Sequence, residues 1–305
     1  MTQYRKPDFF IVGAPKCGTT SLYYYLRQHP QIFMPDYKEP HFFGKDLNKR
    51  SDEFIDNEDE YLTLFKGAKS DQKIGEASTF YLYSKSAPKE IKEYIPDAKI
   101  IIMLRNPIDF LYSLHSQFLF SGNEDVPDFE EALNLEEARI QGNSLPKKID
   151  MLDKIYYRKH VLRIPGQIQS YFETFGVENV AVIILDDLQN NPERCYKKIL
   201  KMLNIDADFS PNYSIQNPNK VVRSFWIRDF IKRNHNYLGK LRGKFYTKPI
   251  GIIRYFIKSN AMALKRKPLS EDMKNKLMDE LRPNIDQLED IINMDLNHWK
   301  LKKNN

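Results

Sequence analysis

Cysteine is almost absent, since the 305 residues include only Cys17 and Cys195. Two cysteines cannot build a disulfide framework, and alone they cannot form a metal site, so the chain is typical of a reducing compartment. Long apolar runs are missing too. No stretch of about 18 apolar residues occurs, and we expect no membrane span. The N-terminal MTQYRKPDFFIVG has no extended apolar segment before the fold begins, so we expect no secretory signal and a cytoplasmic location.

The composition is that of a soluble globular protein, with 41% hydrophobic and 29% charged residues, and the length allows a large core. The net charge of +6 is unevenly distributed. Residues 220–267 hold 14 Lys and Arg against one acid, Asp229, so the rest of the chain is net negative. This asymmetry predicts that the basic segment has its own partner.

Short apolar runs rich in β-branched residues predict buried parallel strands at 9–12, 99–104 and 180–185, with a weaker fourth at 73–78. Helical patterns alternate with them, near 19–29, 106–118, 163–176 and 191–204. This alternation predicts an α/β fold of three αβα layers around a central parallel sheet. Ligands bind at the carboxyl ends of strands in such sheets, which brings the segment 13–21 and Arg105 to one edge.

The last third of the chain is predicted to be helical, without a strand. Ser270 is a good N-cap for one helix, and a second is expected to restart at Pro283. We therefore expect a single domain over 1–305, with an α/β core at 1–215 and a helical, basic part at 216–305.

The segment GAPKCGTTS, residues 13–21, has the composition of a phosphate-binding loop. Main-chain N–H groups at a helix start bind anions, glycines allow close approach, and hydroxyls add donors. The Walker pattern has the same glycine spacing, but here Thr19 replaces its lysine and Lys16 lies inside the loop. Arg105 stands at the end of a second strand, where an NTPase would carry an acid for magnesium. Lys16 and Arg105 together predict a site for an anion with no metal required.

Two segments resemble the signatures of sulfotransferases that use 3′-phosphoadenosine 5′-phosphosulfate (PAPS). PKCGTTS resembles their loop for the 5′-phosphosulfate, and RNPIDFLYS resembles the signature in which an arginine and a serine hold the 3′-phosphate. The resemblance covers most of the chain and implies a P-loop-like sulfotransferase fold, with PAPS as co-substrate and PAP as product. The donor contacts that it implies are Lys16, Cys17, Gly18, Thr19, Thr20, Ser21, Arg105 and Ser113.

Sulfuryl transfer needs positive charge near the breaking bond and a base for the acceptor hydroxyl. Lys16 is expected to supply the charge. KEPHFF, residues 38–43, looks like the segment of heparan-sulfate-type enzymes in which the glutamate is the base, which implies Glu39 as base and His41 as its helper. The alternative is that His41 itself takes the proton.

GEASTFYLY, residues 75–83, resembles an acceptor-side strand end of the same family, and implies acceptor contacts for Glu76 and Ser78. The chain departs from the glycosaminoglycan enzymes at Ala77, where they carry lysine, at Gly44, where they tend to carry an acid, and at Thr20, where they carry arginine. These departures argue against a heparan-like acceptor. The expected acceptor is a hydroxyl or amine of a glycan, glycolipid or small molecule.

NKVVRSFW, residues 219–226, resembles the late loop that covers the nucleotide, which implies phosphate contacts for Arg223 and Ser224. The surrounding basic segment 220–267 is interleaved with aromatics, a mixture that suits nucleic acid or an anionic membrane surface. The simplest interpretation is a solvated helical face with aromatic residues in the core. The main alternative is a peripheral contact with the inner membrane face, and we expect no nucleic acid. Two further alternatives are a P-loop kinase or nucleotide hydrolase, and a non-enzymatic module that binds polyanions or membranes.

Overall fold

The computed structural model of the chain describes residues 4–50, 54–214, 220–222, 261–263 and 268–300. The chain divides into two units, one made of 1–111, 158–217 and 270–305 and the other of 112–157 and 218–269. Each unit is described by itself below. The expectation of a single domain over 1–305 stays a prediction.

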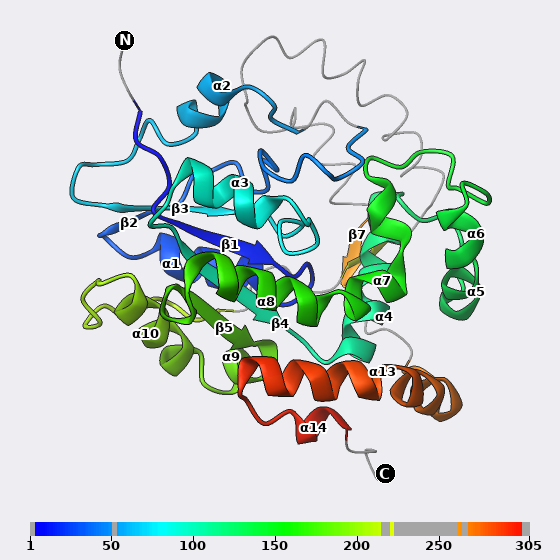
Figure 1. Cartoon of the computed structure of the whole chain (residues 1–305). Coiled ribbons are helices and arrows are strands. Elements are labelled where there is room, and N and C mark those ends of the chain that lie inside the picture. Colours follow the sequence, from blue (N-terminus) through cyan, green and yellow to red (C-terminus); the bar gives the residue numbers. More distant parts are fainter. Residues whose placement is uncertain (1–3, 51–53, 215–219, 223–260, 264–267, 301–305) are drawn as a thin grey trace. The chain divides into compact units, whose positions relative to one another are not determined.

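A five-stranded sheet forms the centre of the first unit, in the order β2-β3-β1-β4-β5, and every strand pair in it is parallel (Figure 1). The strands are β1 (Phe9–Gly13), β2 (Ile32–Phe33), β3 (Lys73–Ala77), β4 (Lys99–Leu104) and β5 (Val180–Ile184). The continuous apolar runs of β1 and β4 are buried along almost their whole length. The four predicted strands are confirmed, while β2 was missed because two residues carry no periodicity.

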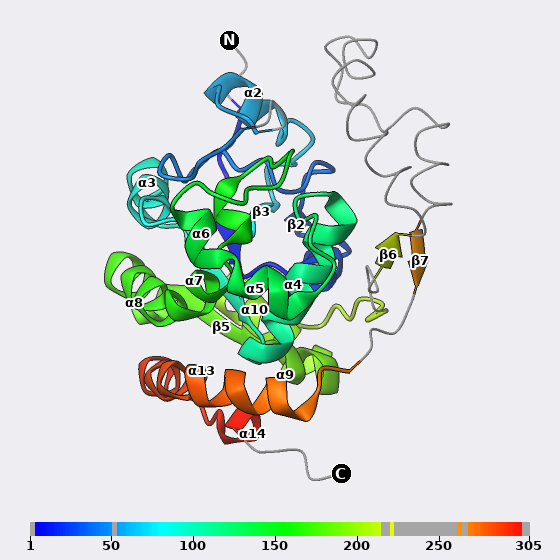
Figure 2. The same ribbon diagram turned by 90° about the vertical axis from the view of Figure 1, so that its right-hand side faces the viewer.

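Helices cover both faces of this sheet, as the prediction of three αβα layers requires (Figure 2). On one face, α1 (Thr19–Arg27) packs against β1 and α10 (Pro192–Met202) against β5. On the other face, α8 (Ile164–Phe175) packs against β4 and β5, with α3 (Ala87–Tyr94) beside it. The smaller helices of this unit are α2 (Glu58–Thr63), α7 (Tyr157–Leu162), which begins at the unit boundary, α9 (Leu185–Asn190), α14 (Asn297–Lys300) and the 3₁₀ turn η2 (Val177–Asn179).

The helix α13 (Glu271–Ile292) packs against α8, and its N-cap Ser270 accepts a hydrogen bond from the Met273 N–H, as predicted. The predicted restart at Pro283 is wrong, because one continuous helix runs through that residue. A proline removes one helical hydrogen bond. Burial of Leu281 and Ile285, which have no exposed surface, outweighs that loss.

The second unit contains most of α4 (Pro107–Ser121), followed by α5 (Phe129–Asn134), α6 (Glu136–Ile140) and the 3₁₀ helix η1 (Leu152–Ile155). It also contains two antiparallel strands, β6 (Lys220–Val222) and β7 (Ala261–Ala263). The prediction of no strand in the last third is therefore wrong. Strands of three residues that pair across a long intervening segment leave no local pattern in the sequence.

The interior of the second unit contains a bidentate ion pair between Arg139 and Glu124. The Arg139 guanidinium donates to both oxygens of the Glu124 carboxylate, at 2.6 Å and 2.8 Å, and the Tyr157 hydroxyl donates to the same carboxylate at 2.8 Å. Burial alone would raise the pKa of Glu124, but the bonds from Arg139 outweigh it and lower the pKa. The carboxylate is thus kept ionised inside the unit.

Among the helices that the structure describes, none has the length and apolar character needed to cross a membrane.

Candidate functional site

The loop between β1 and α1 turns on two glycines that nothing else could replace. A Cβ on Gly13 would lie 2.5 Å from the main-chain O of Thr79, and Gly13 has a φ of 146°. Gly18 has a φ of 85°, and its Cβ would lie 2.7 Å from Leu185 Cδ1. Both positions have a left-handed φ, which favours glycine. At Gly13 the added atom would also meet main chain, and at Gly18 it would meet the end of a leucine side chain. The loop 13–18 is therefore fixed by the strand end and by the segments packed against it.

The start of α1 is left open by this arrangement. Gly18 is the N-cap residue and offers no side-chain hydrogen bond, and no acid lies in the first turn. Thr19 is buried, while Thr20 and Ser21 are half-buried. A helix start without a capping side chain and without acids suits an anion, because its N–H groups and the helix dipole both favour negative charge.

Arg105 lies at the same edge of the sheet, directly after β4. Its Nη1 donates to the main-chain O of Lys16 at 3.4 Å, so the guanidinium reaches the loop itself. Lys16, whose main-chain O accepts this bond, has a left-handed backbone with a φ of 62°. The structure therefore brings these two predicted cations together.

Cys17, between Lys16 and the helix start, is 1% exposed, and burial raises the pKa of its thiol to about 12 in spite of the nearby Arg105. The thiol keeps its proton at neutral pH. What Cys17 can offer an anion is therefore its main chain.

Three predicted residues of the donor site cannot be placed beside these. Ser113 is buried on the part of α4 that belongs to the second unit. Arg223 and Ser224 lie outside the described residues, as does most of 220–267. Their roles, and the membrane contact of the basic segment, stay predictions.

Glu39 and His41 lie together in the loop after β2. His41 Nε2 is 3.5 Å from Glu39 Oε2, and Lys38 Nζ is 2.7 Å from Glu39 Oε1. Burial acts to raise the pKa of Glu39, but the charge of Lys38 and the hydrogen bond with His41 outweigh it and hold the pKa well below its ordinary value. The carboxylate is thus ionised at neutral pH and 38% exposed, so it can accept a proton from a bound molecule.

Glu39 and His41 also have left-handed backbones, with φ of 63° and 49°. In the described part of the chain only six non-glycine residues have a positive φ, and Glu39, His41 and Lys16 are three of these six. Such a conformation costs about 1–3 kcal/mol per residue and persists where surrounding contacts impose it. Three of the predicted catalytic residues are therefore held in conformations that the chain would not choose locally.

Glu76 and Ser78 have an interior position, since neither side chain has any exposed surface. Glu76 lies at the end of β3, where it accepts hydrogen bonds from two buried tyrosines, Tyr61 and Tyr81. The Ser78 hydroxyl accepts from the His41 N–H at 3.1 Å. The expected role of these two residues as acceptor contacts stays a prediction.

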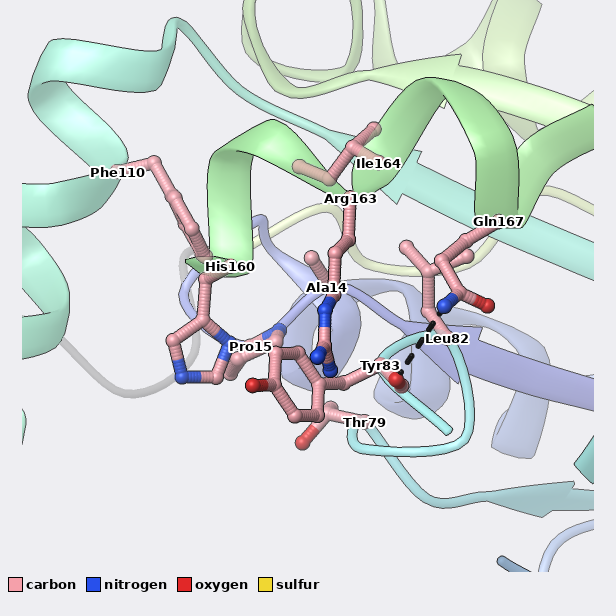
Figure 3. Close-up of a pocket in the computed structure, with 10 residues that line it drawn as sticks. All are labelled: Ala14, Pro15, Thr79, Leu82, Tyr83, Phe110, His160, Arg163, Ile164 and Gln167. Carbon is pink, nitrogen blue, oxygen red and sulfur yellow. Dashed lines mark hydrogen bonds between the residues drawn. The ribbon is translucent and has the colours of Figure 1, made fainter. Parts of the chain in front are cut away.

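A small pocket borders the first residues of the loop, Ala14 and Pro15 (Figure 3). Its cavity volume of about 10 Å³ is enough for about one water. The Arg163 guanidinium lies 5.1 Å from the centre of the Tyr83 ring, and the His160 ring lies 4.4 Å from the same ring. Sequence reasoning missed Arg163, because the signal is only one cation at the start of α8, and nothing local shows that α8 begins beside the loop.

Metal ligands do not gather anywhere in the part of the chain that the structure describes. No three His, Cys, Asp or Glu side chains lie close enough together there to hold an ion. The expectation that the reaction requires no metal stays a prediction.

Comparison with known proteins identifies a family. The model described as Sulfotransferase domain matches residues 6–289. The crystal structure of a sulfotransferase from Alicyclobacillus acidocaldarius superposes with a TM-score of 0.73 and 29% identity, over 97% of this chain and 100% of that one. This match confirms the predicted fold class.

Three curated relatives are also similar in sequence. Carbohydrate sulfotransferase 15 of Mus musculus is 29% identical over 247 residues, which cover 65% of this chain and 44% of that protein. Bifunctional heparan sulfate N-deacetylase/N-sulfotransferase 4 of Mus musculus is 26% identical over 263 residues, or 83% and 28%. Membrane-associated sulfotransferase kil1 of Dictyostelium discoideum is 31% identical over 317 residues, or 78% and 66%. The chain thus spans less than half the length of the first two.

Proposed function

The chain belongs to the sulfotransferase family, and on that premise we propose that it moves a sulfuryl group from PAPS to a hydroxyl group of a carbohydrate acceptor. The observation that carries this proposal is the meeting of Lys16 and Arg105 at one edge of the sheet, joined through the hydrogen bond to the Lys16 main chain. Two cations beside an uncapped helix start suit a ligand with several anionic groups.

The donor is bound in two parts. The loop 13–21 takes the 5′-phosphosulfate through main-chain N–H groups at the start of α1 and through the Lys16 ammonium. Arg105 takes the 3′-phosphate, because its forked donors match a phosphate. A contact from the Ser113 hydroxyl is proposed on the sequence resemblance alone. Arg223 and Ser224 are proposed as further phosphate contacts, on the sequence resemblance alone.

The transfer breaks the bond between sulfur and the oxygen that bridges it to the 5′-phosphate. A new bond forms between sulfur and the acceptor oxygen, and PAP leaves with the bridging oxygen. Negative charge grows on that oxygen as the bond breaks, so the fixed positive charge of Lys16 stabilises the transition state more than the ground state.

The acceptor hydroxyl loses its proton to the Glu39 carboxylate. Glu39 is ionised at neutral pH, and its side chain is partly exposed to a bound molecule. Its low pKa makes it a weak base, so it takes the proton late, once the new S–O bond has made the hydroxyl acidic. His41 lies beside Glu39 and orients it. In the second version of this step, His41 takes the proton itself.

A carbohydrate acceptor is favoured by the names of two relatives, a carbohydrate sulfotransferase and a heparan sulfate N-sulfotransferase.

The experiment is a transfer assay with ³⁵S-labelled PAPS against neutral and acidic oligosaccharides, run with the wild type and with Lys16→Ala. The proposal expects label on at least one oligosaccharide and its loss in Lys16→Ala. Lys45→Ala, an exposed lysine of another loop, is the control that keeps activity. If PAP raises the melting temperature while no oligosaccharide is labelled, the donor half stands and the acceptor class is wrong.

A further inference from the structure

Glu76 is an ionisable side chain buried completely at the end of β3. Its Oε2 accepts hydrogen bonds from the Tyr81 hydroxyl at 2.8 Å and from the Tyr61 hydroxyl at 3.2 Å. No cation forms an ion pair with it among the residues that the structure describes. A buried carboxyl held only by neutral donors is costly. Packing alone would be served better by an apolar side chain, so this placement calls for a role.

The loop that contains Glu39 and His41 is hydrogen-bonded to the segment that follows Glu76. The Glu39 N–H donates to the Ala77 main-chain O at 3.0 Å. The His41 N–H donates to Ser78 Oγ at 3.1 Å. The Phe43 N–H donates to the Tyr81 hydroxyl oxygen at 3.3 Å. Three main-chain donors thus fix the loop. Two of their acceptors, the Tyr81 phenol and the Ser78 hydroxyl, are also bonded to Glu76.

The hydrogen bonds that link Glu76, the Tyr81 hydroxyl and the Phe43 N–H form a positioning path. Their direction depends on whether the Glu76 carboxyl is ionised. A phenol has one proton, and an ionised carboxylate can only accept. While Glu76 is ionised, the Tyr81 proton points at Oε2, and the phenol oxygen is left to accept from the Phe43 N–H. A protonated Glu76 carries a hydrogen that needs an acceptor of its own, and the Tyr81 oxygen is within its reach. The carboxyl and the loop then compete for the same oxygen.

We propose that Glu76 is a positioning residue, whose carboxylate orients the Tyr81 hydroxyl so that it holds the Phe43 N–H and keeps Glu39 and His41 in their strained backbone conformations. This inference rests on the proposed function only in so far as Glu39 and His41 act on the acceptor. It gives Glu76 a different role from the acceptor contact expected from the sequence.

The surroundings make the path sensitive to pH. Burial raises the pKa of Glu76 to about 7, against the lowering effect of the bonds from Ser78, Tyr81 and Tyr61 and of the Lys38 charge. Tyr171 on α8 and Lys49 of the loop also face it. The pKa values of Tyr61, Tyr81 and Tyr171 are raised well above their ordinary value by burial, so these phenols stay protonated. Glu76 is thus the group among them that changes charge near neutral pH.

Tyr81→Phe is the central variant, and Tyr61→Phe is its matched control. Both remove one phenol from the same carboxylate, but only Tyr81 holds a main-chain N–H of the loop. The Tyr61 ring stacks on Phe42 with centroids 4.2 Å apart, and phenylalanine keeps that contact. Glu76→Gln keeps the shape of the carboxyl and removes its ionisation. Turnover of PAPS is measured for all three from pH 5.5 to 9, together with the affinity for PAP.

Tyr81→Phe and Glu76→Gln are expected to lower kcat about 10- to 100-fold with unchanged PAP affinity, while Tyr61→Phe stays within about twofold of the wild type. In the wild type, kcat is expected to rise as Glu76 ionises through about pH 7. This rise is expected to disappear in Glu76→Gln. Equal losses in the two tyrosine variants, or an unaltered pH profile in Glu76→Gln, would overturn the proposal.

Amide hydrogen exchange gives a readout that does not depend on catalysis. The Phe43 N–H is expected to exchange about tenfold faster in Tyr81→Phe than in Tyr61→Phe, because only the first loses its acceptor. If the wild type transfers no sulfuryl group and this difference appears, the proposed function fails and the positioning path stands. If Phe43 exchanges at the same rate in both variants, the path itself is wrong.

Discussion

The Arg105 guanidinium donates from Nη1 to the main-chain O of Lys16, 3.4 Å away, across two neighbouring strand ends. These residues lie 89 positions apart in the sequence, and the parallel pairing of β1 with β4 is what makes them neighbours. The hydrogen bond thus holds Arg105 and the loop residue Lys16 at one edge of the sheet. The proposed donor site depends on this relationship.

Replacement of the proposed base tests the catalytic half of the site. Glu39→Gln keeps the size of the side chain and removes the proton acceptor, so kcat should fall about 10²- to 10⁴-fold while PAP affinity stays the same. Steady-state turnover of PAPS with titration of PAP measures both. Asp36→Asn is the control, because Asp36 is a largely exposed acid three residues earlier that pairs with Arg27.

The same assay with His41→Gln separates the two versions of the step. If Glu39 is the base, His41→Gln loses less activity than Glu39→Gln, since it removes only an orienting partner at 3.5 Å. A Glu39→Gln enzyme with intact turnover, beside an inactive His41→Gln, would assign the proton to His41.

The sequence predicted the features that depend on local pattern. The apolar runs at 9–12 and 99–104 became β1 and β4, and the glycines of 13–21 became the turn that they require. The meeting of Lys16 with Arg105 also followed, because the carboxyl ends of parallel strands share an edge.

Features that depend on distant contacts could not be predicted. Nothing near Glu76 in the sequence shows that Tyr61 and Tyr81 donate to its buried carboxyl, and its expected contact with an acceptor stays a prediction. The pairing of β6 with β7 and the position of Arg163 beside Ala14 likewise arise from segments far apart in the chain. Tertiary packing also carried α13 through Pro283, against its local preference.

The two loop glycines should be intolerant of a side chain. Gly18→Ala places a Cβ 2.7 Å from Leu185 Cδ1 at a φ of 85°, which predicts a loss of about 1–3 kcal/mol in the free energy of unfolding. Urea denaturation measures this loss. Gly166→Ala is the matched control, since its Cβ would meet nothing within 4 Å and it lies inside α8, where alanine is the better helix former. Equal stabilities of the two variants would contradict the packing described for the loop.

Stability should depend on pH through Glu76. Its pKa of about 7 in the folded protein exceeds the ordinary value near 4.3 in an unfolded chain. A carboxyl with a raised pKa binds its proton more tightly when folded, so its contribution is full below about pH 4 and is lost as pH rises through about 7. Relative to Glu76→Gln, the wild type should lose about 3 kcal/mol of unfolding free energy between pH 4 and pH 8. Parallel pH profiles of the two proteins in urea denaturation would show that Glu76 does not titrate in this range.

The buried ion pair of the second unit predicts a large effect of a single replacement. Arg139→Met leaves the Glu124 carboxylate without its two charged donors, at a cost of about 3–5 kcal/mol. The double variant Glu124→Leu, Arg139→Met should recover most of that loss, because no charge is then buried. Denaturation of the single and double variants measures the difference. A single variant as stable as the double one would mean that the pair does not hold this unit together.

The most direct test of a donor site built on Lys16 and Arg105 is the affinity for PAP compared with that for adenosine 5′-monophosphate. Calorimetric titration should show the wild type binding PAP at least about 150-fold more tightly, because two or more charged hydrogen bonds to the 3′-phosphate contribute about 1.5–3 kcal/mol each. Arg105→Ala should abolish most of that preference and leave the monophosphate unaffected, while Arg5→Ala, an arginine paired with Asp8, should change neither affinity. A wild type that binds the two nucleotides equally, or an Arg105→Ala variant that weakens both by the same factor, would contradict the proposed site.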